Sequence, residues 1–214
     1  MQKKNLMRTW LLSICLIATS AVSNASTPDL QMPNIKAFQP LIDDIARRFP
    51  KAPQDPLIVI SASEQKLYLI KNNQVVASHT ISTATAGLGN QSGSNKTPLG
   101  VHRISQKFGK DAQLGTIFKA RINTRRVAKI LTNPNERSTA DNVTSRILWL
   151  SGMEKGINKG GKVDSHARYI YIHGTDEEGR LGQPASHGCI RMKNQSVIDL
   201  FKQVPIGTIV NIVE

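Results

Sequence analysis

The sequence is poor in cysteine, in aromatic residues and in acidic side chains. Of its 214 residues only two are cysteine, 5% are aromatic, and 28 Lys and Arg stand against 15 Asp and Glu. Two cysteines exclude both a disulfide-rich scaffold and a zinc site with four thiolates. The hydrophobic fraction of 39% excludes a wholly disordered chain. The net charge of +13 indicates an anionic partner, which nucleic acid, a membrane or an acidic polymer would satisfy.

The sequence also lacks an apolar run of the ~20 residues that a membrane-spanning helix needs. The N-terminal run, residues 10–18, follows three positive charges and precedes the small residues at 23–25. This order is typical of a secretory signal peptide, so we expect residues 1–25 to be removed by cleavage after Ala25, although a buried N-terminal helix is the alternative. Ile14 directly before Cys15 argues against a lipid anchor. We therefore expect a protein that lies outside the cytoplasm, with no transmembrane segment once the signal is removed.

Removal of the signal peptide changes both the charge and the cysteine count. Residues 26–214 carry 25 basic and 15 acidic side chains, a balance of +10, and Cys189 becomes the only cysteine. A single thiol cannot form an internal disulfide. Because an unpaired thiol is a liability in an oxidising compartment, its presence requires a reason.

The periodicity of the remaining chain predicts a mainly β domain. Residues 26–56 are predicted to form a linker and a short amphipathic helix at 40–49, with Pro40 in its first turn. The domain itself, a sandwich or barrel, is predicted over 57–214, with a helix at 193–204 for which Asn194 is the expected N-cap. We expect loops at 84–97 and 108–146. The predicted strands are 57–61, 66–71, 74–82, 100–107, 146–151, 169–173 and 208–213.

The residues with catalytic potential gather near Cys189. A cysteine nucleophile needs a base, since a free thiol with a pKa of ~8.5 is mostly protonated at neutral pH. His173 lies sixteen residues earlier in the sequence and His187 two residues earlier. Arg191 and Lys193 add positive potential, from which we expect stabilisation of a thiolate.

Two other interpretations of these residues stay open at this point. A lone cysteine is often a small buried hydrophobe, although polar neighbours such as His187 fit a core poorly. Alternatively, His173, His187 and Cys189 supply the three ligands of a zinc site, but no acidic residue stands at a helical spacing to serve as a base. We predict neither a metal nor a cofactor. The other histidines of the chain, expected to be surface or strand residues, are His79, His102 and His166.

Three separated motifs resemble those of one family. His173-Gly174-Thr175, followed by the run from Ser186 to Arg191 (SHGCIR), is similar to the signature of the L,D-transpeptidase catalytic domain (YkuD) family of bacterial cell-wall enzymes. The run 97–100 (TPLG) is similar to the TPxG element of the same family. The resemblance covers about residues 57–214. Only twelve residues separate His173 from Ser186, which is short for the family and requires a tight loop.

The resemblance implies a β-sandwich or barrel with a short helix after the catalytic cysteine, and it assigns roles to the motif residues. Cys189 would attack the peptide bond before the terminal D-alanine of a peptidoglycan stem peptide. His173 would take the thiol proton and return one to the leaving amine, and the backbone of Gly174 would orient its ring. His187 and Gly188 would form the oxyanion site.

Two further residues would contact the substrate. Arg191 would bind the D-alanine carboxylate, a pair that suits the planar guanidinium. Ser186 would bind the substrate or fix the shape of its loop. A surface role for Arg191 is the alternative.

Together with the export signal, the resemblance implies a periplasmic protein, and it also implies the partners. An acceptor amine on a second stem peptide would give a 3–3 cross-link, and an amine on an envelope protein would anchor that protein, whereas water would make the enzyme an L,D-carboxypeptidase. Carbapenems, which are β-lactams, would acylate Cys189. Export and the low aromatic content argue against nucleic acid as the partner, and a wall-binding protein without catalysis would need no thiol.

Overall fold

The computed structural model describes residues 32–214. The predicted signal peptide and the first part of the predicted linker lie outside these residues, so both stay predictions. Among residues 32–214, no helix has the length and apolar character needed to cross a membrane. The described chain is mainly β, as predicted, with two α-helices and three short 3-10 helices.

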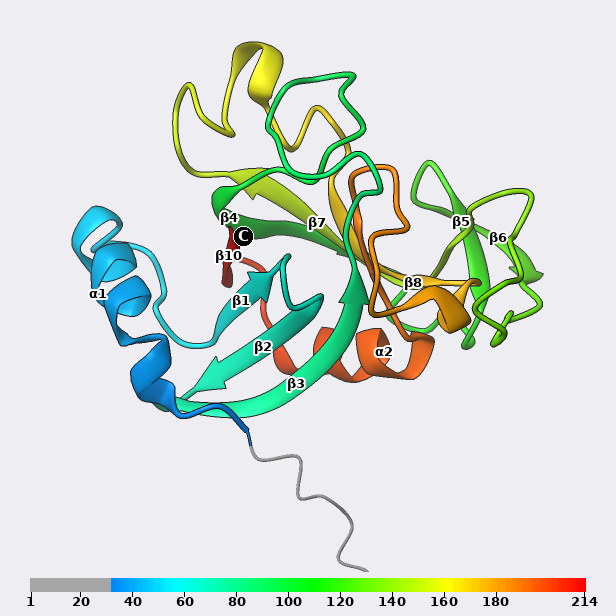
Figure 1. The fold of residues 1–214 in the computed structure, drawn as a ribbon, viewed down its shortest axis with the longest axis horizontal. Helices are drawn as coiled ribbons and strands as arrows, with labels where there is room; N and C mark the ends of the chain where they lie inside the picture. Colours follow the sequence, from blue (N-terminus) through cyan, green and yellow to red (C-terminus); the bar gives the residue numbers. More distant parts are fainter. Residues whose placement is uncertain (1–31) are drawn as a thin grey trace, which may run out of the picture. The chain divides into compact units, whose positions relative to one another are not determined.

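Ten strands form one sheet that closes on itself. The strands are β1 (Leu57–Ser61), β2 (Lys66–Lys71), β3 (Gln74–Ser82), β4 (Gly100–Phe108), β5 (Thr116–Lys119), β6 (Ile122–Val127), β7 (Val143–Gly152), β8 (Tyr171–Thr175), β9 (Ile190–Met192) and β10 (Ile209–Val213). Their order is β4-β10-β1-β2-β3-β9-β8-β7-β5-β6, and an additional β4–β7 pairing closes a barrel. The hairpin of β5 and β6 extends beyond β7 at one side (Figure 1).

The first and last strands are direct neighbours. β1 and β10 pair in parallel, from Leu57 opposite Ile209 to Ser61 opposite Val213. The other parallel pair, β8 with β9, places His173 opposite Arg191. Two of the predicted site residues therefore come together through strand register alone.

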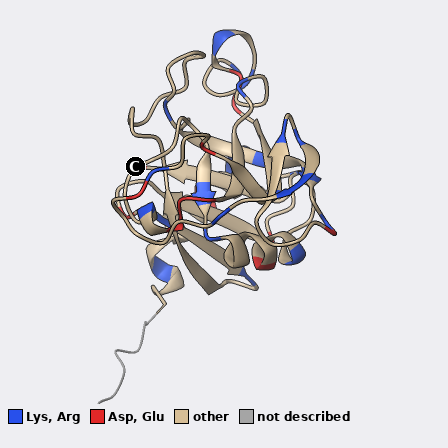
Figure 2. Ribbon diagram, turned by 90° about the vertical axis from the view of Figure 1, so that its right-hand side faces the viewer, with Lys and Arg blue, Asp and Glu red and all other residues tan. Residues whose placement is uncertain are grey.

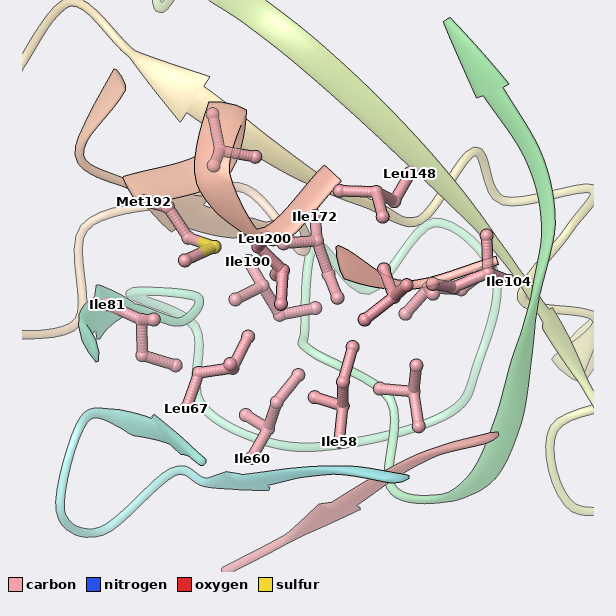
Figure 3. Packing of buried hydrophobic residues seen from close by; sticks show 14 of the residues in the cluster. Ile58, Ile60, Leu67, Ile81, Ile104, Leu148, Ile172, Ile190, Met192 and Leu200 are labelled. Atoms are coloured by element: carbon pink, nitrogen blue, oxygen red, sulfur yellow. The ribbon is translucent and has the colours of Figure 1, made fainter. Parts of the chain in front are cut away.

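Alternation along β1 separates two apolar clusters. Ile58 and Ile60 point into the barrel and join the main core with residues such as Leu67, Ile172 and Leu200 (Figure 3). Leu57 and Val59 belong to a second cluster on the other face. All of β1 is buried because both faces of the strand are covered.

Helix α1 (Gln39–Arg48) covers the second cluster, where Ile45 is its buried residue. Pro40 stands in the first turn, where the missing N–H has no intrahelical partner to lose. The end of the helix is fixed by an ion pair from Arg48 to Glu154, which follows β7. The predicted N-terminal helix is thus confirmed, shifted by one residue.

Helix α2 (Asn194–Gln203) follows β9, at the position predicted for the helix after the cysteine. Its apolar side places Val197, Leu200 and Phe201 in the main core. The prediction of Asn194 as N-cap is wrong, because Lys193 occupies that position. The Asn194 side chain is instead fully buried, accepts hydroxyl hydrogen bonds from β7 and donates to Thr175 O at 2.7 Å.

Five of the seven predicted strands agree with the structure to within one residue at each end, and β9 was not predicted. Residues 108–146, predicted as a loop, contain β5, β6 and the start of β7. The strand predicted at 169–173 begins at Tyr171, because Tyr169 has a left-handed backbone with φ of 58°. The Asn72-Asn73 turn between β2 and β3 has φ of 49° and 56°, as the predicted two-residue hairpin requires.

Candidate active site

The turn from Ser186 to Cys189 is held together by the Ser186 hydroxyl. This hydroxyl donates to Cys189 O at 2.6 Å and accepts from Gly188 N at 3.2 Å. Gly188 has φ of 127°, in a region that favours glycine. Ser186 is 1% exposed, so its hydroxyl is used inside the turn. Its role in substrate binding stays a prediction, and the geometry favours the alternative of fixing the loop.

The TPLG run supports the turn from the other side. Thr97 is fully buried and its hydroxyl accepts from Ala84 N at 2.9 Å, while Ala84 itself bridges to Ser186. Gly100 has φ of 96°, and a Cβ there would overlap the Glu154 carboxylate. The run therefore acts in the packing beneath the site.

The Cys189 thiol lies against the backbone that enters β8. Tyr171 N donates to Sγ at 3.4 Å, and Sγ donates to Tyr169 O at 3.4 Å. Tyr171 and His173 are two residues apart on the same strand, so their side chains share one face of the sheet. The half-buried thiol and the buried imidazole thus belong to one site.

A backbone hydrogen bond fixes the His173 ring. Its Nδ1 lies 2.7 Å from Gly174 O, and a carbonyl only accepts, so Nδ1 carries the proton. In the neutral ring Nε2 is then unprotonated and able to take a proton. This contact has the geometry expected for Gly174 as the backbone orienter.

Burial keeps both groups uncharged at rest. It raises the pKa of the Cys189 thiol to about 11, and it lowers the pKa of His173 to about 4. Arg191 and Arg168 act on the thiol pKa in the opposite direction, but desolvation outweighs them. The expectation that positive neighbours stabilise a thiolate is therefore corrected: the resting site holds a neutral thiol beside a neutral imidazole.

Arg191 is a buried cation with two carboxylate partners. It is 2% exposed, with Nη1 at 2.7 Å from Glu177 Oε2 and Nη2 at 2.5 Å from Asp141 Oδ1. Its Nε is buried without a partner in the described chain. The alternative of a surface arginine is wrong, since the guanidinium is enclosed. A substrate carboxylate would have to replace one of the two acidic partners.

Asp141 links this arginine to the turn. Its second oxygen lies 2.6 Å from Nδ1 of His187, whose side chain is 72% exposed. Burial acts to raise the pKa of Asp141, but the charge of Arg191 and the hydrogen bond from His187 bring it below its ordinary value. Asp141 is therefore ionised at neutral pH, and it fixes His187 by one ring nitrogen.

Sequence reasoning missed Asp141, Asp176 and Glu177. Asp141 lies in the segment predicted as a basic loop, with no motif around it. Asp176 and Glu177, directly after the His173-Gly174-Thr175 motif, hold that segment in place: Ser138 donates its N–H to Glu177 at 2.7 Å and its hydroxyl to Asp176 at 2.6 Å. Their position after a motif was the available signal.

Two hollows open on either side of His187. One, of about 370 Å³, is lined by polar residues that include Arg137, Asp141 and Arg191. The other, of about 250 Å³, is lined by residues that include Asn95, Arg168 and Tyr169. His187 lines both hollows, whereas Cys189 and His173 line neither of them.

An aromatic cluster lies beside the second hollow. The Trp149 ring stacks on His166 at 3.9 Å between centroids and meets Tyr171 edge-on at 5.7 Å. Arg121, from the turn between β5 and β6, lies over Trp149 and donates to the Tyr171 hydroxyl at 3.0 Å.

The three histidines predicted as surface or strand residues lie in different surroundings. His79 stands on β3, and His102 stands on β4 and is fully buried. His166 stacks on Trp149 in the aromatic cluster.

No group of three or more His, Cys, Asp and Glu side chains within residues 32–214 is placed to hold a metal ion. The zinc alternative therefore has no ligand set in this part of the chain. His173 Nδ1 and His187 Nδ1 are both engaged in hydrogen bonds, to Gly174 O and to Asp141.

Comparison with known proteins places this site in a family. The family model for the L,D-transpeptidase catalytic domain matches residues 55–212. A putative L,D-transpeptidase of Bacillus subtilis, YqjB, is 26% identical over 73% of this chain and 70% of its own length. A probable L,D-transpeptidase of Escherichia coli, YcfS, is 24% identical over 77% of this chain but only 45% of its own.

Solved structures of L,D-transpeptidases are also similar. The L,D-transpeptidase LdtMt1, solved in complex with imipenem, is 16% identical, with a TM-score of 0.44, over 74% of this chain and 58% of that one. The chain thus spans less than two thirds of the length of two of these three relatives, YcfS and LdtMt1. The match of the family model, which covers more than half of the sequence and includes all three motifs, decides the assignment. The chain belongs to the L,D-transpeptidase catalytic domain family.

Proposed function

We propose that the protein is a peptidoglycan L,D-transpeptidase that works by cysteine acyl transfer. The observation that carries the proposal is the packing of the Cys189 thiol against β8. On the same strand, Gly174 O holds the His173 ring in the form whose Nε2 can accept a proton. Membership of the family supplies the substrate class, and the site supplies a nucleophile and a base.

The proposed reaction begins from the neutral pair. Sγ attacks the carbonyl carbon before the terminal D-alanine while His173 Nε2 takes the thiol proton. The resulting imidazolium gives that proton to the departing amine of D-alanine, which leaves a thioester on Cys189. An amine of a second stem peptide then attacks the thioester, His173 takes a proton from this amine, and the thiol is released protonated.

Two features of the site support transfer to a second peptide. The hollows on either side of His187 offer separate spaces for a donor and an acceptor chain. The N–H groups of Gly188 and Cys189 are proposed as oxyanion donors, with His187 beside them. In the resting turn Gly188 N is occupied by Ser186 Oγ at 3.2 Å, a long bond that an oxyanion would replace.

Arg191 is proposed as the partner of the D-alanine carboxylate, in exchange with Asp141. The half-buried Asp141 side chain is the more accessible of its two partners, since Glu177 is 3% exposed. Entry of a substrate carboxylate would release Asp141 from both Arg191 and His187. The donor peptide would then lie in the polar hollow that contains these residues.

The activity is proposed to lie outside the cytoplasm, in a periplasm, and the signal-like N-terminus together with the cell-wall substrate supports this. The acceptor is an amine of a stem peptide or of an envelope protein, and carbapenems are proposed to acylate the same thiol. The related LdtMt1 was solved with imipenem, which supports this class of inhibitor.

The test is incubation with a disaccharide-tetrapeptide, followed by mass spectrometry of the products. We expect a dimer that has lost one D-alanine, and we expect no product from Cys189→Ala or His173→Gln. His79→Gln, a histidine on β3 away from the thiol, is the matched control and should keep full activity. Product formation by Cys189→Ala would refute the thiol mechanism.

The same experiment identifies the alternative. A tripeptide without dimer would show that water is the acceptor and that the protein is an L,D-carboxypeptidase. Unchanged substrate with the parent protein, combined with retained binding, would indicate a wall-binding protein. Mass analysis after exposure to a carbapenem should show one adduct on the parent protein and none on Cys189→Ala.

A further inference from the structure

The hairpin of β5 and β6 carries a charge of one sign only. Between residues 112 and 135 there is no Asp or Glu, and we call residues 114–129 the basic hairpin. Its five cationic residues are Lys119, Arg121, Arg125, Arg126 and Lys129. No salt bridge in the described chain involves any of them. Figure 2, seen from the side on which this hairpin lies, marks the basic positions of the ribbon in blue and the acidic ones in red.

The same hairpin exposes aliphatic side chains. Ile122, directly after the turn, is 70% exposed and is the most exposed large hydrophobic residue among those described. Val127 is 51% exposed and Leu114 is 41% exposed. Three of the eight exposed large hydrophobic residues of the described chain therefore lie on one short hairpin that also carries five cations.

Protection of a sheet edge explains the cations of the basic hairpin but not its exposed aliphatic side chains. β6 is the last strand of the sheet, and cations on an edge strand discourage pairing with other chains. An edge built for that purpose alone would not expose an isoleucine at its tip. Exposed aliphatic groups among cations, with no acidic residue nearby, match a surface that meets anionic lipid: the cations pair with headgroups and the aliphatic groups enter the region below them.

We propose that the basic hairpin binds the surface of an anionic lipid bilayer, with Ile122 inserted among the headgroups. A soluble polyanion would account for the cations but would leave Ile122 in water. The bilayer satisfies both features, and it is the occupant to which the proposal commits.

Contacts of Arg121 connect the hairpin to the thiol site and so determine where the site would lie when the hairpin is docked. This side chain leaves the hairpin turn, lies 5.3 Å from the Tyr169 ring centroid and donates to the Tyr171 hydroxyl. The backbone of both tyrosines contacts the Cys189 thiol. A docked hairpin therefore holds the thiol site close to the bilayer surface.

A second exposed isoleucine provides the matched control. Ile157 is 51% exposed and lies between Lys155 and Lys159, but this loop also contains the acidic residues Glu154 and Asp164. This loop has a similar exposed isoleucine and similar cations, but its charged residues are of both signs. Equivalent substitutions in the two loops separate the proposed surface from the general positive charge of the protein.

The test is co-sedimentation with vesicles, using the chain from residue 26 onward so that the apolar run at 10–18 does not bind by itself. The three apolar clusters are built from residues 35–213, so this chain retains the described core. Vesicles of neutral phosphatidylcholine are compared with vesicles containing about one third phosphatidylglycerol. We expect binding only to the anionic vesicles, and we expect half-molar salt to release it.

Substitutions then locate the surface. Arg125→Gln with Arg126→Gln should weaken binding about thirtyfold, since each cation near a bilayer contributes about 1 kcal/mol. Ile122→Ser should weaken it about tenfold. Lys155→Gln with Lys159→Gln, and Ile157→Ser, should each change it by less than about threefold. Circular dichroism should show every variant folded, because all of these side chains are exposed.

Three results would overturn the proposal. One is equal binding to neutral and anionic vesicles. Another is an Ile122→Ser variant that binds as tightly as the parent, which would point to a soluble polyanion as the partner. The third is an equal loss from the Lys155 and Lys159 substitutions, which would assign the effect to net charge alone. Each of these readouts is independent of transpeptidase activity.

Discussion

At the scale of single residues, the site is controlled by desolvation more than by charge. Cys189 has Arg191 and Arg168 in its surroundings, yet burial still raises the pKa of its thiol to about 11. In the proposed mechanism, the thiolate is therefore generated during attack, by proton transfer to a histidine that is itself neutral. The sequence showed the positive neighbours but contained no signal for how deeply the strands would enclose the pair.

This has a measurable consequence for alkylation and for activity. Iodoacetamide should label Cys189 slowly at pH 7, and the rate should rise about tenfold per pH unit up to about pH 10. Because His173 has a pKa of about 4 and the thiol one of about 11, kcat/KM should be flat from about pH 6 to 9. Labelling monitored by mass spectrometry, with Cys189→Ala as the blank, checks this. A labelling midpoint near pH 7 would instead indicate a preformed thiolate and imidazolium pair.

At the scale of elements, the polar contacts between strands and helices are the least visible in the sequence. Asn194 looked like a helix cap, but its amide joins α2 to β7 and β8 through Thr144, Ser145 and Thr175. Such a role depends on residues up to 50 positions away, which no local pattern contains. Conversely, β1 to β3 were found with correct bounds, because their alternation and the Asn-Asn turn are local signals.

Removal of the Asn194 amide should destabilise the junction of these elements. Asn194→Ala leaves buried hydroxyl and carbonyl groups without partners, so we expect the free energy of unfolding to fall by about 2 to 3 kcal/mol. Urea denaturation monitored by circular dichroism measures this. Gln195→Ala, an exposed position in the same first turn, should change the value by less than about 0.5 kcal/mol. Equal stability of the two variants would contradict the proposed junction.

The β5/β6 hairpin is the element that the sequence patterns failed most clearly to predict. Both strands are short, and β6 is basic and mostly exposed. The hairpin therefore lacks the apolar alternation by which strands are recognised. Positive φ at Ala120 and Arg121 forms its turn without glycine, which removes the usual turn signal. Asp141 was hidden for a related reason, since its partners His187 and Arg191 are brought to it only by the fold.

At the scale of the whole molecule, two buried histidines connect folding to pH. His102 on β4 and His173 on β8 both have a pKa lowered to about 4 by burial, against 6.5 when exposed. Between pH 6.5 and 4 the unfolded chain therefore binds protons that the folded chain does not. Stability from these groups is complete above pH 6.5 and is lost as the pH falls towards 4.

We expect the free energy of unfolding to drop by about 2 to 3 kcal/mol per histidine between pH 7 and 4.5. Urea denaturation at a series of pH values measures the slope. His79→Gln, whose side chain is less deeply buried, should leave most of this slope in place, whereas His102→Gln should reduce it. A stability that is constant over this range would show that the two imidazoles are not held neutral.

The parallel pairing of β1 with β10 also bears on the order in which the chain folds. β1 has two neighbours: β2, which follows it directly in the sequence, and β10, which is far from it along the chain. The pairing of β1 with β2 is local, whereas the pairing of β1 with β10 joins distant segments and is expected to form late in folding. A chain shortened before β10 would therefore leave one edge of β1 and one edge of β4 without their strand partner.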